Sequence, residues 1–190
     1  DGPGLSAGST SSSPVAIIAT LGFFATSGRI QPTDAATAIC CGLMRVPFFR
    51  TTFPVLINLT SDSDLSSHAQ SNGNDILFTS SDGVTKLSHE IEKYTSITGA
   101  LVAWVKVPSL SSSVDTDLYM YYGNPTCGSQ EDIINVWDSN FKGVWHLKED
   151  PSGTAPQMKD SSSNGNNGTS YGTMTTSDQV AGKIDGSLDF

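Results

Sequence analysis

Residues 118–124, Leu-Tyr-Met-Tyr-Tyr-Gly-Asn, form a dense run of β-forming side chains that ends in a Gly-Asn turn signal. Aromatic residues favour strands and Gly-Asn favours a turn, so this run predicts a strand that completes a sheet. A second run of this kind, Ala100–Val107, stops at Pro108, and the polar residues 109–117 between the two runs predict a loop. Two such strands need a sheet on which to bury their apolar faces, so the fold is organised around β-structure.

Shorter strand signals precede these two runs. Strands are predicted at residues 55–59, directly after Pro54, at residues 76–79, and at residues 85–94, which come after the Ser81-Asp82-Gly83 hairpin turn. The polar residues 61–71, with Leu65 as an apolar anchor, predict one helical turn. Short strands at regular spacing predict an all-β fold, a jelly-roll-like antiparallel β-sandwich, over residues 45–126.

Composition narrows the class of protein. The chain has 190 residues, a formal net charge of −9 and only 15% charged residues. Nucleic-acid phosphates and anionic membrane surfaces require clustered Lys and Arg, so neither is an expected partner. The apolar run Val15–Ala25 is shorter than the roughly 20 residues that span a bilayer, so no membrane insertion is expected. The low charged fraction and the abundance of Ser, Thr, Gly and Asn are typical of surface-rich β proteins, and we predict an extracellular or cell-surface protein.

Residues 1–44 are predicted to be a linker or the remnant of a preceding segment, partly disordered, because Gly, Ser, Thr and Pro dominate their start. Within them, Val15–Ala25 fits either the apolar region of a signal peptide, without its basic start, or a buried strand. Gln31–Gly42 predicts a short helix. The chain begins without Met and ends in mid-pattern, which predicts a fragment of a longer protein.

The three cysteines have no metal-site or redox spacing. Cys40 and Cys41 are adjacent, and adjacent cysteines rarely bridge each other because the geometry is strained. Either of them can pair with Cys127, which would leave one thiol over, and the alternative is three free thiols.

Five segments of the central region resemble, in order and spacing, the prokaryotic domain-of-unknown-function family 2341, which is found in large secreted or surface proteins. These segments are Phe53–Ile57, Asn74–Thr79, Leu87–Glu92, Trp104–Pro108 and Tyr119–Asn124. The resemblance covers about residues 48–125 and implies a module within a larger extracellular chain.

After a predicted linker at residues 127–139, residues 140–190 resemble the truncated start of a concanavalin A-like, laminin-G-type domain. They contain a short strand signal at Gly143–Leu147, a turn-dense loop at Asp160–Gly168 and a strand signal at Gly182–Phe190. The resemblance implies a second, incomplete β-sandwich. Complete domains of this kind often bind glycans or calcium.

No catalytic residues are predicted, and the chain is not expected to be an enzyme. Glu90 and Glu92, or Asp115 and Asp117, are carboxylate pairs of the kind that glycosidases use. Period-2 alternation instead makes Glu90 and Glu92 part of an exposed polar strand face. Gly73, Gly83 and Gly123 sit singly in turns, so no phosphate-binding glycine loop is predicted.

We expect a binding role rather than catalysis, because Trp104, Tyr119 and Tyr121 lie on the two strongest strand signals. If their strand faces coincide, they form an aromatic platform for sugar rings; the alternative is that they fill the core between two sheets. Asp75, next to Asn74, and Asp160, near Asn164, are candidate Ca²⁺ ligands, with turn capping as the alternative. No other cofactor is expected.

The sequence supports three hypotheses for a secreted or surface module within a larger protein. The first is adhesion or carbohydrate recognition, with glycans or other surface proteins as partners. The second is a structural spacer that binds no ligand. The third is an accessory module of a polysaccharide-degrading enzyme. Exposed aromatic side chains favour the first hypothesis, and buried ones favour the second.

Overall fold

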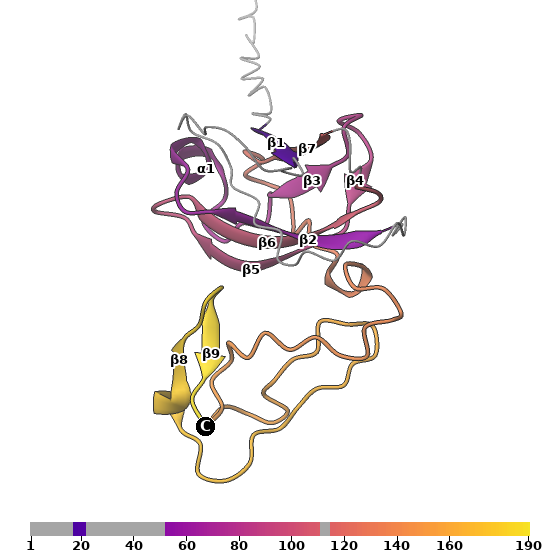
Figure 1. Ribbon diagram of the computed structural model, residues 1–190. Helices are drawn as coiled ribbons and strands as arrows, with labels where there is room; N and C mark the ends of the chain where they lie inside the picture. Colours follow the sequence, from indigo (N-terminus) through magenta and orange to yellow (C-terminus); the bar gives the residue numbers. More distant parts are fainter. Residues whose placement is uncertain (1–16, 22–51, 111–114) are drawn as a thin grey trace, which may run out of the picture.

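The computed structural model describes residues 17–21, 52–110 and 115–190, and in these ranges the chain is mostly β, with three small antiparallel sheets and one short helix (Figure 1). The strands are β1 Ile17–Leu21, β2 Phe53–Leu59, β3 Leu77–Thr79, β4 Lys86–Leu87, β5 His89–Thr95, β6 Ala100–Val107, β7 Thr116–Tyr121, β8 Gln179–Ala181 and β9 Gly186–Leu188. The helices are α1 Ser63–His68 and the 3₁₀ turns η1 Ile133–Asn135 and η2 Thr176–Asp178. Among the described residues, no helix is long and apolar enough to cross a bilayer.

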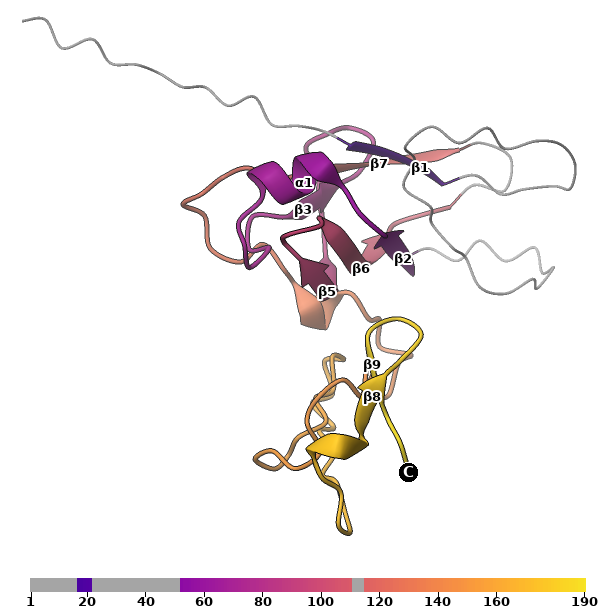
Figure 2. The same cartoon turned by 90° about the vertical axis from the view of Figure 1, so that its left-hand side faces the viewer.

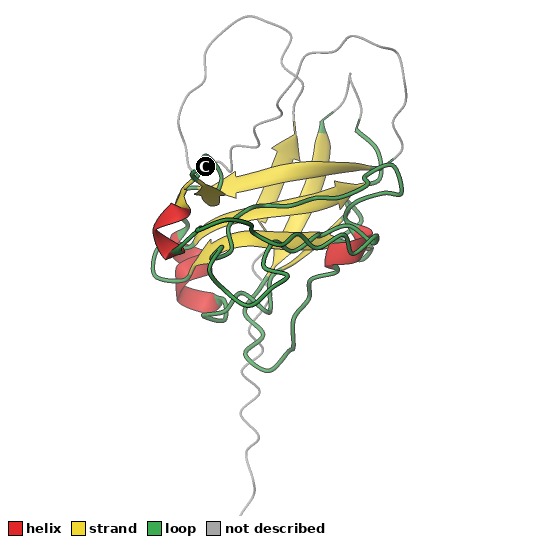
Figure 3. Ribbon diagram, turned by 90° about the horizontal axis from the view of Figure 1, so that it is seen from below, coloured by secondary structure: helices red, strands yellow, loops and turns green. Residues whose placement is uncertain are grey.

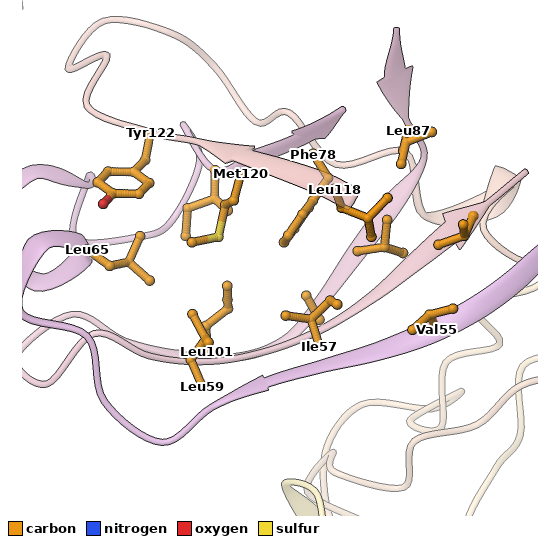
Figure 4. Close-up of a cluster of buried hydrophobic side chains, with 14 residues drawn as sticks. Val55, Ile57, Leu59, Leu65, Phe78, Leu87, Leu101, Leu118, Met120 and Tyr122 are labelled. Atoms are coloured by element: carbon orange, nitrogen blue, oxygen red, sulfur yellow. The ribbon is translucent and has the colours of Figure 1, made fainter. Parts of the chain in front are cut away.

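Two of the sheets face each other across one hydrophobic core. The four-stranded sheet has the order β1-β7-β3-β4, and the three-stranded sheet has the order β2-β6-β5. Apolar side chains from both sheets point into the space between them (Figure 4), including Phe78 from β3, Leu118 from β7 and Ile57 from β2. The all-β prediction is confirmed at this level. The described strands do not show a closed sandwich or a jelly roll.

Sequence periodicity located the central strands well and one upstream strand less well. The run at Ala100–Val107 is β6 with the predicted bounds, whereas the run at residues 118–124 gives β7, which starts at Thr116 and ends at Tyr121. The predicted single strand at residues 85–94 is two strands in different sheets. The chain crosses between the sheets at Ser88, whose carbonyl accepts a hydrogen bond from Lys106 N (2.9 Å).

The predicted helical turn is α1, which rests against the turn between β5 and β6. Its cap is Asp62, whose carboxylate accepts from Leu65 N (2.7 Å), and Leu65 is fully buried. Asp62 N in turn donates to Thr98 O (2.9 Å). The next residue, Gly99, has a φ of +65°, and an added Cβ would collide with the Asp62 carbonyl. Only glycine fits this close approach.

Within the N-terminal region, the structure shows strand β1, which pairs antiparallel with β7. The strand interpretation of Val15–Ala25 is therefore confirmed for residues 17–21, and these residues of the predicted linker belong to the four-stranded sheet. The predicted helix at Gln31–Gly42 lies outside the described residues, as do Cys40 and Cys41. The bridge from either cysteine to the half-buried Cys127 stays a prediction.

Residues 127–190, here called the C-terminal segment, lie against the outer face of the three-stranded sheet (Figures 2 and 3). The segment first runs along the free edge of β5, where Asp132 N donates to His89 O (3.0 Å) and Ile91 N donates to the Glu131 carboxylate (2.7 Å). These contacts protect a strand edge that would otherwise be open to pairing. Further along, the predicted strand at Gly182–Phe190 is the hairpin strand β9, paired with β8.

Candidate functional site

The outer face of the three-stranded sheet carries two carboxylates beside an indole. Alternation in β6 sends Val105 into the core and Trp104 outward, and Glu90 of β5 is the cross-strand partner of Trp104. A register shift comes next in β5, so Glu92 is left without a cross-strand partner. The carboxylate of Glu92 accepts a hydrogen bond from the Trp104 indole N–H (2.6 Å).

Three side chains of the C-terminal segment cover these carboxylates. Trp137 Nε1 donates to Glu90 Oε2 (3.0 Å), and Ser161 Oγ donates to Glu90 Oε1 (2.6 Å). The imidazole of His146 lies between the two carboxylates, with Nε2 3.2 Å from Glu90 Oε1 and Nδ1 3.2 Å from Glu92 Oε2. The Nε2 contact is ionic and lacks hydrogen-bond alignment. We call six residues the polar cluster: Glu90, Glu92, Trp104, Trp137, His146 and Ser161.

Aromatic rings enclose the polar cluster on one side. The Trp137 ring lies 5.3 Å from the Trp104 ring and 5.1 Å from the Phe141 ring, measured between centroids, and 6.2 Å from the imidazole of His146. The tilted and edge-on angles between these rings, 52–68°, are the favoured arrangements of aromatic pairs. This packing keeps water from the ion pairs and strengthens them.

The prediction that Glu90 and Glu92 form an exposed polar face is wrong. Both residues are only 5% exposed. The alternation did place them on the same outward face of β5, as the sequence indicated. What the pattern could not show is that the C-terminal segment covers that face, because Trp137, His146 and Ser161 lie far away in the sequence.

Burial and pairing act in opposite directions on the ionisation of the cluster. Burial by itself raises the pKa of a carboxyl group, but the contacts with His146, together with hydrogen bonds from Ser161 and the two indoles, hold the pKa of Glu90 and Glu92 below the usual range. Burial likewise lowers the pKa of an imidazole, but the two carboxylates outweigh it and raise the pKa of His146 to about 9. At neutral pH the cluster therefore holds two carboxylates and one imidazolium.

A fourth charge lies next to the cluster. Lys148 Nζ donates to the backbone carbonyl of Glu92. Its positive charge also lowers the pKa of the Glu92 side-chain carboxyl group. Two negative and two positive groups thus meet at the junction of β5 with the C-terminal segment. Buried charges are tolerated when they are paired in this way.

Asp160 organises the loop that carries Ser161 to Glu90. Its carboxylate accepts from Val144 N (2.8 Å), Ser162 N (2.9 Å) and Asn166 N (2.8 Å). Burial opposes ionisation, but these donors outweigh it and lower the pKa of Asp160 to about 2. The loop is thereby fixed to the strand-like residues before His146, so Ser161 and His146 approach the sheet together.

The contacts of the two candidate calcium ligands match the turn-capping alternative. Both oxygens of the Asp75 carboxylate accept main-chain N–H groups, from Gln70 (2.9 Å), Gly123 (2.7 Å) and Asn124 (3.1 Å). Both oxygens of Asp160 are occupied by donors as well. In the part of the chain that the structure describes, no group of three or more His, Cys, Asp or Glu side chains is placed to hold a metal ion.

The three predicted platform residues lie on opposite sheets. Trp104 faces outward from β6, where its indole is bound to Glu92. Tyr119 and Tyr121 belong to β7 of the four-stranded sheet, and both are half-buried. The Tyr121 hydroxyl donates to Gly83 O (3.2 Å). The structure therefore does not bring Trp104 together with the tyrosines.

Sequence reasoning missed Trp137, His146 and Ser161 as members of a site. The only available signal was their place in apolar or turn-rich stretches near the predicted linker. The arrangement pairs Ser161 with the Glu90 carboxylate and not with His146. Its chemistry is that of mutual charge pairing.

These features define a β module whose sheet is joined to the C-terminal segment through a buried polar cluster. The sequence model of a family described as a domain of unknown function (DUF2341) matches residues 72–148. The match supports the predicted resemblance over residues 72–125 and extends beyond it to residue 148. It contains every member of the polar cluster except Ser161.

No match was found among curated proteins or among solved structures. The comparisons also give no evidence for a concanavalin A-like or laminin-G-type domain in residues 140–190.

Proposed function

We propose that this chain is a non-catalytic structural module of a larger secreted or cell-surface protein, and that it holds the segment after its sheets in one fixed orientation. The observation that carries this proposal is the polar cluster, in which β5 and the C-terminal segment exchange buried charges and hydrogen bonds. The cluster joins residues that are up to 71 positions apart.

The energetics of buried charge support an orienting role. A buried ion pair adds little net stability compared with an apolar contact of the same size, because desolvation offsets the attraction. Its partners nevertheless fit in only one arrangement, since any displacement leaves a buried carboxylate unpaired. A junction built this way specifies geometry more than it adds strength, which is the property that a spacer between neighbouring domains needs.

Adhesion or carbohydrate recognition is the second candidate, with an accessory module of a polysaccharide-degrading enzyme as its special case. Two exposed aromatic side chains of the C-terminal segment favour it: Trp145 is 43% exposed and Tyr171 is 90% exposed. Flat aromatic faces of this kind stack on sugar rings. The platform residue expected from the sequence, Trp104, is instead engaged with Glu92 and Trp137.

The finer fold assignments belong to the same proposal. The two facing sheets would form a jelly-roll-like sandwich, for which the shared core is the supporting observation. Residues 140–190 would be the start of a concanavalin A-like, laminin-G-type domain, supported by the turn-dense loop at Asp160–Gly168 and by the β8–β9 hairpin.

The test is to measure ¹⁵N relaxation on the full chain and compare the rotational correlation times of the sheets and of the C-terminal segment. We expect one common value in the wild type and two values in a Glu90→Ala, Glu92→Ala variant. Asp64→Asn, which removes an exposed carboxylate on α1, is the control. Independent tumbling in the wild type, or rigid coupling in the double variant, would contradict the structural role.

A glycan array addresses the second candidate with the same protein. Binding that disappears in Trp145→Ala or Tyr171→Ala would favour carbohydrate recognition. Binding that these variants leave unchanged would place the sugar site elsewhere.

A further inference from the structure

Among the described residues, the imidazole of His146 is the positive group that contacts both carboxylates of the polar cluster. The charged groups around it come from two elements: Glu90 and Glu92 of β5 contact the ring, and Lys148 of the C-terminal segment binds the backbone carbonyl of Glu92. Nearby, Lys93 of β5 pairs with Asp185 before β9 (3.0 Å), at a more exposed position. The Trp137 ring, which packs against the imidazole, and Trp104 and Ser161, which bond the two carboxylates, carry no charge.

We propose that the proton on His146 controls the junction, and that its loss releases the C-terminal segment from the three-stranded sheet. The inference rests on the proposed structural role and adds a regulation to it. The same segment would be held rigidly when His146 is charged and would move independently when His146 is neutral.

The geometry gives the physical reason. A neutral imidazole has one N–H and one lone pair, so it can donate to only one of the two carboxylates. The other carboxylate would then face the ring lone pair in a buried site, with the repulsion of its neighbour added. Lys148 offsets part of this charge but reaches the backbone carbonyl of Glu92 and not the carboxylate of Glu90. Separation of the segment from the sheet returns both carboxylates to water.

The direction of the pH dependence is set by linkage. The docked state raises the pKa of His146 from its ordinary value of 6.5 to about 9. A raised histidine pKa contributes stability that is complete below about 6.5 and is lost as the pH rises through about 9. Between these two values the ratio of released to docked segment should rise about tenfold per pH unit.

The experiment tracks the ¹H–¹⁵N signals of the tryptophan indoles in the full chain from about pH 6 to about pH 10, with acrylamide quenching of fluorescence beside it. The indole N–H of Trp137 donates to Glu90 across the junction, so its signal reports docking directly. The Trp104 indole bonds Glu92 within the sheet and reports docking through its contact with the Trp137 ring. In the wild type we expect the Trp137 signal to move to a solvent-exposed position as the pH approaches 9, the Trp104 signal to shift as the Trp137 ring leaves it, and quenching to rise in parallel.

His146→Gln removes the charge and leaves a polar side chain, and His68→Gln on the exposed face of α1 is its control. We expect His146→Gln to show released indole signals already at about pH 6 with no further response up to pH 10, and His68→Gln to behave as the wild type. A wild-type pH response that persists in His146→Gln would overturn the inference.

Two outcomes separate the inference from the proposed function. Indole signals that stay in their docked positions throughout the titration would overturn the switch and leave the structural role intact. Signals that are released at every pH would contradict the structural role itself. Should His146→Gln fail to fold, the imidazole ¹³Cε1–¹H titration of wild-type His146 decides: an ordinary titration, uncoupled from the indole signals, would overturn the switch.

Discussion

The indole N–H of Trp137 donates to Oε2 of Glu90 over 3.0 Å, across 47 positions of sequence. Glu90 lies in β5, whereas Trp137 lies within the predicted linker, so this bond ties the sheet to the C-terminal segment. The Trp137 ring also packs on Trp104 of the neighbouring strand β6. Residues 127–139 thus contribute to the packing of the β module as well as connecting it to residues 140–190.

Replacement of Trp137 should separate packing from hydrogen bonding. Trp137→Ala removes a buried ring and is expected to lower the free energy of unfolding by about 3 to 5 kcal/mol. Trp137→Phe keeps most of the ring contacts but leaves Glu90 without one donor, and should cost about 1 to 3 kcal/mol. Urea denaturation measures both values. The more exposed Trp145 provides the control, since Trp145→Phe should lower the free energy of unfolding by about 1 kcal/mol or less. Equal losses of stability in Trp137→Phe and Trp145→Phe would contradict the role of the buried hydrogen bond.

His89 should make the protein sensitive to mild acid, on the opposite side of neutrality from His146. The ring is fully buried against Phe78, and its Nε2 has no hydrogen-bond partner among the described residues. Burial lowers the pKa of His89 below 6.5, with Lys86 acting in the same direction and Asp132 against it. A lowered histidine pKa means that stability is complete above about 6.5 and is lost as the pH falls below that value.

His89→Leu removes this titrating group. We expect its urea midpoint to fall less than that of the wild type between about pH 7 and about pH 5, a range above the ordinary pKa of the glutamates. His68→Gln should behave as the wild type. An equal fall in His89→Leu and the wild type would show that His89 does not cause the acid sensitivity.

Two glycines with the same backbone conformation should respond differently to substitution. Gly99 and Gly165 have φ values of +65° and +64°, but only at Gly99 does an added Cβ meet other atoms, chiefly the carbonyl of Asp62. Gly165→Ala should therefore cost only the conformational strain, about 1 to 2 kcal/mol. Gly99→Ala adds a collision and should cost about 3 kcal/mol or more. Thermal unfolding compares the two, and similar losses would mean that the contact between α1 and the β5–β6 turn adapts easily.

Asp75 should stabilise the fold through its hydrogen bonds to the main chain and not by binding calcium. Asp75→Ala leaves three main-chain N–H groups without their acceptor and is expected to lower stability by at least about 3 kcal/mol, whereas the exposed Asp64→Asn should change it by about 0.5 kcal/mol or less. The melting temperature of the wild type should be the same in calcium and in EDTA. A calcium-dependent rise in the wild type that is absent from Asp75→Ala would favour the metal-ligand alternative.

The strands could be predicted where local pattern and tertiary contacts agree. Ala100–Val107 lies in the middle of its sheet, so its alternation is fixed by the core on one side and its bounds are clear. The strand predicted at residues 85–94 is present but is divided at Ser88, where the chain crosses between the sheets, and no local residue preference marks such a crossing. The aromatic platform failed for a similar reason: alternation gives the face within one strand, and strand order decides whether two faces meet.

The sequence by itself determined the β class of the protein, the turn positions and the shared outward face of Glu90 and Glu92, because these depend on residue preferences and the period of a strand. Only the tertiary structure decided that this outward face is buried. The covering residues are Trp137, His146 and Ser161. Trp137 lies 47 positions and Ser161 lies 71 positions from their partner Glu90 in the sequence. Contacts over such separations leave no periodic pattern in the sequence, so local analysis does not detect them.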